Sequence, residues 1–528
     1  MVLHKHVKSK ILPKNRQHTD ASKENQSLHS LAYSSRYATT DVPKTEIPQK
    51  PAGSTTAYQL IHDELDLDGT PAMNCASFVH TWMEPEADKL MMENISKNMS
   101  DQDEYPATMR IHGRCISMIG NMWNAENAIG TATTGSSEAI MLGGLALKKR
   151  WQARQKKAGK DTYHPNIIMG NNAQVALEKF ARFFDVEARL IPVSDESHYA
   201  LDIKKAVEAC DENTIGIFVI LGSTYTGHFE DVKGLSDLLD AYQEKTGIDI
   251  PIHVDAASGG FVAPFAFPNL VWDFKIPRVS SINTSGHKYG LCYAGIGWIL
   301  WKSEEYLPKE LIFELHYLGG TEYSYTINFS RPACFMIGQY YNFLRLGVEG
   351  FTNVANNDLI NAREFAKGLE DSGYFDVVSD LHRPKGVFGW KEKSGISKAK
   401  EVVSKAGVID YNPHLPVVSF KLTDEYKKNC PHVKQGAIST LIRTKGWIVP
   451  NYPLPPDADS IEILRVVVRE SLSKDMLTLL LEDIVEATKR LANVENAVES
   501  FYLTSNIHVG IGKDAEIPSN NNTYSRPC

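Results

Sequence analysis

The sequence predicts an α/β protein, with a mostly parallel sheet in a large domain and a smaller α+β domain toward the C-terminus. Two observations support this prediction. Short, almost uninterrupted apolar runs alternate with helical patterns through the middle of the chain, and beyond about residue 345 long helices with two strand candidates take over. Apolar strands that alternate with helices are typical of a parallel sheet covered on both faces.

The composition of the 528-residue chain excludes two broad classes of protein. Hydrophobic residues make up 42% and charged residues 23%, which is an ordinary globular mixture. The 56 Lys and Arg against 64 Asp and Glu give a net charge of −8. This mild acidity argues against a nucleic-acid binder, which needs a basic face. No apolar run approaches the roughly 18 residues of a membrane span.

The first residues and the cysteines both indicate a cytoplasmic protein. The N-terminal segment is basic but has no apolar core, so a secretory signal is not expected. A transit peptide would be rich in arginine, whereas the first 17 residues contain one arginine, Arg16, so a transit peptide is not expected either. The seven cysteines lie far apart and form no C-x-x-C pair. They fit neither a disulfide framework nor a zinc site, and reduced thiols are the expectation. No metal is expected.

Four segments are expected along the chain. The first is rich in Ser, Thr, Lys, Gln and Pro, as in a flexible or weakly helical arm. The expected segments are the arm (1–57), the large domain (58–345), the small domain (346–495) and a polar tail (496–528).

Most elements can be placed from periodicity. A helix is expected to start at Ser136-Ser137-Glu138 and to end in basic residues, as its dipole favours. The other helices are expected over 233–246 and 475–491. The strands are expected at 166–169, 214–221, 252–255, 279–283 and 295–301 in the large domain, and at 417–422 and 461–468 in the small one.

The segment Ser285-Gly286-His287-Lys288-Tyr289-Gly290 directly follows an expected apolar strand. A lone lysine is usually a surface charge. Here two glycines allow a sharp turn and a close approach of the backbone to a ligand. A partly desolvated lysine has a lowered pKa, which is the condition for forming a Schiff base. Lys288 is therefore a candidate carbonyl-binding residue.

Asp255 ends another buried strand, in Ile252-His253-Val254-Asp255. Such a residue is most often a cap or a turn residue, but the carboxyl ends of parallel strands are where α/β sheets bind ligands. Pyridoxal phosphate (PLP) enzymes need a lysine for the cofactor aldehyde and a carboxylate that keeps the pyridine nitrogen protonated. Lys288 and Asp255 supply both groups.

Thr134-Gly135-Ser136-Ser137-Glu138 opens the first long helix. It is either an N-cap or a phosphate cradle, because free helix N-terminal amides, hydroxyls and a glycine suit a dianion. The signal is weak alone. Together with Asp255 and Lys288, in this order, it makes a strong set.

Four stretches, TGSSEA, HVDAASGGF, INTSGHKYGL and YAGIGWILW, together resemble the PLP-dependent group II decarboxylases, most closely the glutamate decarboxylases of plants, fungi and bacteria. The resemblance covers roughly residues 55 to 495, and no Walker loop or zinc-protease helix competes with it. It implies the aspartate-aminotransferase-like fold type I. The implied activity is PLP-dependent decarboxylation of L-glutamate to 4-aminobutanoate and CO2 through a Schiff base on Lys288.

The resemblance also implies roles for particular residues. The catalytic residues would be Lys288, Asp255 and Tyr317, with Tyr317 on a mobile flap reprotonating the product or, alternatively, packed in the core. The substrate residues would be Ser77, Phe78 and Asp101 for the distal carboxyl group and Arg465 for the α-carboxylate. The cofactor residues would be Ser136, Ser137, Gln174, Thr224, Asp255, Ser285, His287, Lys288 and, from a neighbouring subunit, Ser330.

Some of these roles have plain alternatives in the sequence. Gln174 would otherwise be a surface amide, Thr224 a turn residue, and Asp101 part of a solvated acidic loop. Arg465 lies in an otherwise apolar strand, where an unpaired arginine would cost several kcal/mol, so a functional partner is expected.

Substrate and partners follow from the same resemblance. The rival substrates are an aromatic amino acid or cysteine sulfinate, and the rival class is a PLP-binding protein without activity. An aromatic substrate would need an apolar pocket where Asp101 and Ser77 are expected. A homodimer is the expected minimum, with a hexamer as the larger assembly. Calmodulin is not expected as a partner, because the C-terminal tail has no basic stripe and no tryptophan.

Overall fold

The computed structural model describes residues 42, 44–316, 322–389 and 410–493, and divides the chain into two units, up to Thr70 and from Pro71 onward. The described part of the first unit holds one helix, α2 (Ser54–Leu65), with Tyr58, Ile61 and Leu65 exposed. The expected boundary between arm and large domain, at 57/58, falls inside this helix. The tail expected at 496–528 lies outside the described residues.

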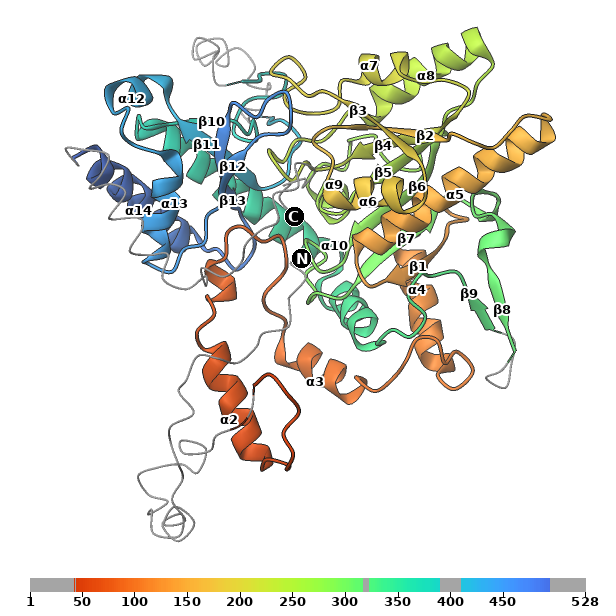
Figure 1. Ribbon diagram of the computed structural model, residues 1–528, viewed down its shortest axis with the longest axis horizontal. Helices are drawn as coiled ribbons and strands as arrows, with labels where there is room; N and C mark the ends of the chain where they lie inside the picture. The colour runs from red at the N-terminus through yellow and green to blue at the C-terminus, as the bar shows by residue number, and fades with distance from the viewer. Residues whose placement is uncertain (1–41, 43, 317–321, 390–409, 494–528) are drawn as a thin grey trace. The chain divides into compact units, whose positions relative to one another are not determined.

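The second unit holds a seven-stranded sheet, in the right half of Figure 1, with the order β1-β7-β6-β5-β4-β2-β3. Only β7 runs antiparallel to its neighbours. The prediction of a mostly parallel sheet is therefore confirmed. The strands are β1 (Ile129–Thr133), β2 (Asn166–Gly170), β3 (Glu187–Ile191), β4 (Thr214–Ile220), β5 (Ile252–Asp255), β6 (Val279–Ser285) and β7 (Gly297–Trp301).

Helix α5 (Ser136–Lys157) lies against the large sheet and against helix α6 (Val175–Phe183), and one glycine allows a close approach to each. A Cβ on Gly143 would come within 2.5 Å of the His253 ring, and one on Gly144 within 2.5 Å of the Phe180 ring. The remaining elements of this part are η2 (Pro71–Met73), α3 (Pro85–Glu93), α4 (Pro106–Met122), α7 (Ile203–Glu208), α8 (Val232–Thr246), η3 (Gly259–Phe261), α9 (Ala263–Ala266), η4 (Glu304–Tyr306), η5 (Lys309–Leu311), β8 (Phe313–Leu315) and β9 (Glu322–Ser324).

A second, antiparallel sheet of four strands has the order β10-β11-β13-β12. Its core includes residues from helix α10 (Cys334–Asp371), which kinks at Gly347, where φ is 58°. This kink lies two residues beyond the domain boundary expected at 345. The other elements are β10 (Phe375–Val377), β11 (Val417–Leu422), α12 (Asp424–Asn429), α13 (Gln435–Arg443), β12 (Asn451–Pro453), β13 (Glu462–Val467) and α14 (Lys474–Ala492).

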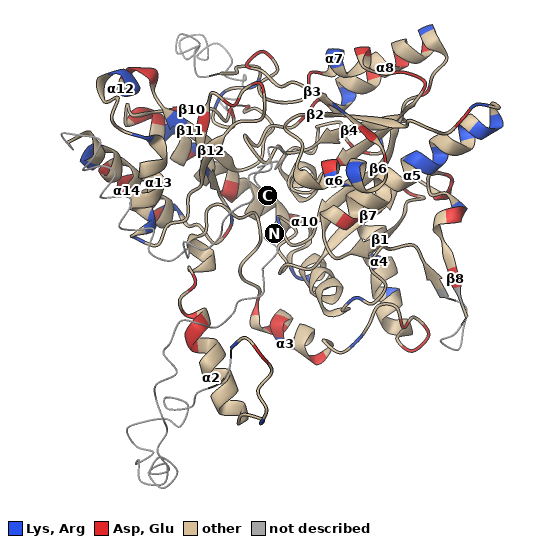
Figure 2. Ribbon diagram, in the orientation of Figure 1, with Lys and Arg blue, Asp and Glu red and all other residues tan. Residues whose placement is uncertain are grey.

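Charged residues lie on many of the helices, as the ribbon colouring of Figure 2 shows. A basic cluster lies at the C-terminal end of α5, which carries Arg154, Lys156 and Lys157 in its last turn. Cations are favourable there because they face the negative end of the helix dipole. None of the described helices is long and apolar enough to span a bilayer.

Candidate active site

A cavity of about 460 Å³ opens at the carboxyl ends of β4 and β5, beside the first turn of α5. Ligands of α/β sheets bind at this edge. Most of the site residues expected from the sequence line this one cavity. They are Ser77, Phe78, Ser136, Ser137, Gln174, Thr224, Asp255, His287 and Lys288.

Lys288 reaches the cavity from the turn that follows β6. Its Nζ donates to Ser258 Oγ at 3.3 Å and lies 5.3 Å from the centre of the Phe78 ring. Burial lowers the pKa of Lys288 from 10.5 to about 8; the Asp255 carboxylate opposes this change, and the Arg465 guanidinium adds to it. A larger fraction of this amine is therefore neutral, and nucleophilic, than in an ordinary lysine.

This lowered pKa has a measurable consequence in the apoprotein. An amine reacts only when it is deprotonated, so a lower pKa moves the onset of reactivity to lower pH. We expect acetylation of Lys288 to be half-maximal near pH 8, whereas an unperturbed lysine reaches this point near pH 10.4. Competitive labelling with acetic anhydride, followed by peptide mass spectrometry, measures the profile, with exposed Lys233 as internal reference. A Lys288 midpoint above pH 10 would contradict the prediction.

Asp255 ends β5 and is 4% exposed. Its Oδ1 accepts hydrogen bonds from Asn283 Nδ2 at 2.8 Å and from the Ala257 amide at 3.1 Å. Burial raises the pKa of Asp255, while Asn283, Lys288 and the Ala257 amide act against it. Among the described residues none donates to Oδ2, so this oxygen is available to a donor in the cavity.

The first turn of α5 has the features of an anion site. No side chain caps it; instead the Glu138 carboxylate reaches back to the amide and hydroxyl of Thr134, both at 2.9 Å. Free amides at a helix N-terminus favour a bound anion such as phosphate. Ser136 and Ser137 add two hydroxyl groups to this end of the cavity.

One further observation supports the fit of a phosphate group to this turn. The buried His287 Nδ1 has no hydrogen-bond partner among the described residues, and burial lowers the pKa of His287 to about 4, with a further effect of Lys288. A neutral imidazole can donate one N–H to an anion. Beneath the turn, a Cβ on Gly297 would lie 2.5 Å from the carbonyl carbon of Gly135, so only glycine fits there.

Arg465 lies on β13 directly behind the cavity lining and is 2% exposed. Its Nη1 and Nη2 donate to the carbonyl oxygens of Thr224 and Ala76, each at 2.6 Å, and Nε has no partner among the described residues. The guanidinium lies 5.1 Å from the centre of the Phe78 ring, and Lys288 Nζ lies 5.3 Å from the same point. Phe78 therefore contacts both cations of the site.

Gln174 and Ser77 each make one local hydrogen bond. Gln174 precedes α6 as its N-cap, and its Oε1 accepts from the Ala176 amide at 2.6 Å. Ser77 Oγ accepts from the Val79 amide at 3.1 Å. Both side chains are half-buried and line the cavity, so neither is an isolated surface group.

Several expected residues do not line this cavity. Ser285 is buried at the end of β6, and its Oγ has no partner among the described residues. Asp101 and Ser330 lie together elsewhere, because Asn98 Nδ2 donates to Asp101 Oδ1 at 3.2 Å and to Ser330 Oγ at 3.3 Å. Tyr317 lies outside the described residues.

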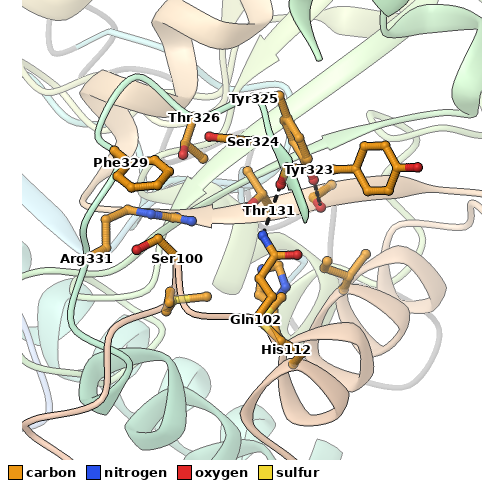
Figure 3. A pocket seen from close by; sticks show the side chains of 14 residues that line it. Ser100, Gln102, His112, Thr131, Tyr323, Ser324, Tyr325, Thr326, Phe329 and Arg331 are labelled. Carbon is orange, nitrogen blue, oxygen red and sulfur yellow. Dashed lines mark hydrogen bonds between the residues drawn. The ribbon is translucent and has the colours of Figure 1, made fainter. Parts of the chain in front are cut away.

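A second cavity, of about 260 Å³, adjoins the segments that carry Asp101 and Ser330 (Figure 3). Gln102 donates to the Tyr323 carbonyl at 3.0 Å across it, and Arg331 lines the opposite side. His112 Nε2 accepts from the Ala132 amide at 2.9 Å, and burial, then Arg331, lowers the pKa of His112 to about 3. His112 is therefore a neutral side chain that accepts a hydrogen bond from the backbone of β1, which is a structural role.

Sequence reasoning missed Ser258 and Asn283, which contact Lys288 and Asp255 respectively. Ser258 stands three residues after Asp255, in the same motif. Asn283 lies directly opposite Asp255 in the β5–β6 pairing, a register that the sequence alone does not indicate.

One cavity thus brings together a lysine with a lowered pKa, a buried carboxylate and an uncapped helix N-terminus at the carboxyl edge of a mostly parallel sheet. These are the features of a PLP-dependent enzyme of fold type I.

Comparisons with known proteins agree with this class. The conserved domain of pyridoxal-dependent decarboxylases matches residues 44–391. A glutamate decarboxylase of Petunia hybrida is 47% identical over 89% of this chain and 87% of its own length. That of Saccharomyces cerevisiae is 46% identical over 88% and 82%. The solved structure of Lactobacillus brevis glutamate decarboxylase superposes with a TM-score of 0.78 at 37% identity, covering 87% of this chain and 98% of that one.

The chain therefore belongs to the pyridoxal-dependent decarboxylase family, and it is similar to glutamate decarboxylases over most of its length. The expected fold type and cofactor, PLP, are confirmed. A sphingosine-1-phosphate lyase from Burkholderia pseudomallei, at 16% identity and a TM-score of 0.68, shares the fold alone.

Proposed function

We propose that this chain decarboxylates L-glutamate to 4-aminobutanoate and CO2, with PLP bound to Lys288. The observation that carries the proposal is the convergence of Lys288, Asp255 and the α5 N-terminus on one cavity. The similarity to glutamate decarboxylases over most of the chain supports L-glutamate as the substrate.

The residues of the cavity can be assigned to the parts of the cofactor. Bound PLP supplies an aldehyde for the substrate amine and a ring that accepts the electron pair released as the bond from Cα to the carboxylate breaks. Asp255 Oδ2 would accept a hydrogen bond from the ring nitrogen. The residues proposed to hold the phosphate, ring and phenolic oxygen are Ser136, Ser137, His287, Gln174 and Thr224, and Ser285, buried at the end of β6, is proposed to take part with them.

Arg465 would orient the α-carboxylate of the substrate. Two of its N–H groups donate to carbonyls of the cavity lining, and Nε is buried without a partner among the described residues, so a direct contact with the substrate would require the lining at Ala76, Phe78 or Thr224 to shift. Arginine's rigid fork suits a carboxylate. A tight pair would stabilise the ground state and slow the loss of CO2, so the benefit must come from orientation of the scissile bond.

The distal carboxyl group would meet the Ser77–Phe78 end of the cavity. Asp101 and Ser330 are joined through Asn98 and line no part of this cavity, so they could act together only from a neighbouring subunit. We therefore propose a homodimer as the minimum assembly, with one subunit supplying both residues to the other's site. Proton return to the product by Tyr317 is part of the same proposal.

The cysteines and the charge of the chain support proposals about where the protein is located and which partners it lacks. The six cysteines of the described residues are free thiols, which supports a cytoplasmic location. The acidic balance of the whole chain supports the absence of a nucleic-acid partner. Calmodulin is not proposed, because the C-terminal tail lacks a basic amphipathic stripe.

The test of this function is release of labelled CO2 from a panel of amino acids. We expect L-glutamate to be turned over, with at least about 10²-fold lower kcat/KM for L-phenylalanine and L-tyrosine, because a site built for a carboxylate leaves polar groups unpaired when an aromatic side chain enters. The side chain of cysteine sulfinate is also an anion but is shorter than that of glutamate, so we expect its kcat/KM to be lower by about 10-fold or more. Equal turnover of glutamate and an aromatic amino acid would contradict the assignment. Turnover of none of them by the PLP-loaded protein would indicate a binding protein without activity.

A further inference from the structure

Behind Asp255 lies a row of buried polar side chains that the proposed chemistry does not use. Strands β5 and β6 pair in parallel, with His253 opposite Ser281 and Asp255 opposite Asn283. Because side chains alternate along a strand, residues two positions apart share a face, so all four lie on the same face of the sheet. All four are buried: His253 and Asn283 are 0% exposed.

These side chains form a continuous chain of hydrogen bonds. The Ser281 Oγ lies 2.7 Å from His253 Nδ1, and His253 Nε2 lies 2.7 Å from Asn283 Oδ1. Asn283 Nδ2 then donates to Asp255 Oδ1 at 2.8 Å. The chain ends at the carboxylate proposed to meet the cofactor.

The chemistry of the end groups fixes the direction of every bond. An ionised carboxylate only accepts, so Asn283 must turn its NH2 group to Asp255 and its oxygen to His253. His253 Nε2 must then carry a proton. Burial lowers the pKa of His253 to about 4, so the ring is neutral near neutral pH, and Nδ1 accepts from the Ser281 hydroxyl. Each group thus donates toward Asp255.

The imidazole is held rigidly and has no access to the substrate. A Cβ on Gly143 of α5 would lie 2.5 Å from His253 Cε1, and the Phe218 ring packs edge-on with its centre 5.1 Å away. His253 does not line the cavity. Any effect of this residue on the reaction must therefore pass through Asn283 and Asp255.

We propose that His253 is a positioning residue that acts through Asn283 to keep the Asp255 carboxylate ionised, so that the proton shared with the ring nitrogen of PLP stays on the ring. The proposal rests on the proposed function. Donors to a carboxylate stabilise its charged form, whereas burial favours the neutral acid. Without His253 the Asn283 oxygen is left buried and unpaired, the donor to Asp255 loses its fixed orientation, and the proton moves from the ring nitrogen to Asp255 Oδ2.

The test is the 15N NMR shift of ring-labelled PLP in the holoenzyme, which reports directly whether the ring nitrogen is protonated. His253→Leu removes the donor, whereas His253→Gln keeps an amide N–H for Asn283 and a carbonyl for Ser281. We expect the wild type and the Gln variant to show a protonated nitrogen, and the Leu variant to shift toward the unprotonated form. With glutamate, kcat should fall about 10- to 100-fold in the Leu variant and KM less than threefold.

Two controls separate this proposal from the proposed function. If Asp255→Asn leaves the ring nitrogen protonated, the role of Asp255 itself is wrong. If Asp255→Asn deprotonates the ring but His253→Leu shows the wild-type shift, only the role of His253 is overturned.

In an Asn283→Ala background, His253→Leu should have no additional effect, and an undiminished effect would contradict action through Asn283. Should the Leu variant not fold, His253→Phe, closer in shape, is measured in its place and judged by the same criteria.

Discussion

Replacement of Lys288 by alanine will abolish decarboxylation of L-glutamate, with kcat/KM falling by at least about 10³-fold. Lys288 supplies the only lysine amine lining the cavity among the described residues, and burial lowers its pKa to about 8, which raises the fraction of neutral amine above that of an ordinary lysine. Alanine removes the amine to which PLP is proposed to be bound. The measurement is release of labelled CO2 in the presence of excess PLP.

A matched lysine variant controls for general effects on the protein. Lys233→Ala changes an exposed lysine of α8 that pairs with Asp237 on the same helix. It should keep the wild-type rate and absorbance spectrum. If Lys288→Ala retained a kcat/KM within tenfold of the wild type, the mechanism proposed here would be wrong.

Asp255→Asn is expected to lower kcat about 10²- to 10³-fold while the protein stays folded. The amide has nearly the same shape as the carboxylate but carries no charge to stabilise a protonated ring nitrogen. The carboxylate is buried and accepts two hydrogen bonds on Oδ1. The main effect of the substitution is therefore to remove the negative charge that Oδ2 presents to the cavity. Single-turnover kinetics with saturating PLP measure the effect.

A second buried carboxylate provides the control for this substitution. Asp273 is also 4% exposed, but it contacts Asn124 and the Lys275 amide and does not line the cavity. Asp273→Asn should change kcat less than threefold. Equal losses in the two variants would assign the effect of Asp255 to protein stability.

The central sheet was predictable where its strands are buried on both faces. The expected strands at 166–169, 214–221 and 279–283 correspond to β2, β4 and β6, all of whose residues are buried. Strand β3 was missed because it is partly exposed and begins with Glu187, and β1 because its residues, Ile-Gly-Thr-Ala-Thr, are mostly small. Such runs have no periodicity that separates strand from loop.

The site was predictable where a role depends on local sequence. Lys288 and Asp255 stand at strand ends, and Ser136 and Ser137 open a helix, so each could be placed at the ligand-binding edge before any contact was known. Asp101 could not be placed, because its separation from the cavity depends on tertiary packing around Asn98.

The hydrogen-bond chain behind Asp255 could not be predicted because it depends on strand register. The β5–β6 pairing shifts between Ile252 and His253, and this irregularity sets His253 opposite Ser281 and Asp255 opposite Asn283. Run lengths in the sequence do not indicate such a shift.

Borohydride reduction of the active, PLP-loaded protein, followed by proteolysis and mass spectrometry, tests the central claim most directly. The claim is that the Lys288 amine carries the cofactor beside Asp255. We expect the reduced cofactor on the peptide that contains Lys288 and on no other peptide, with loss of activity in proportion to the label. A label on another lysine, or an unlabelled Lys288 in protein that is fully inactivated, would contradict the account.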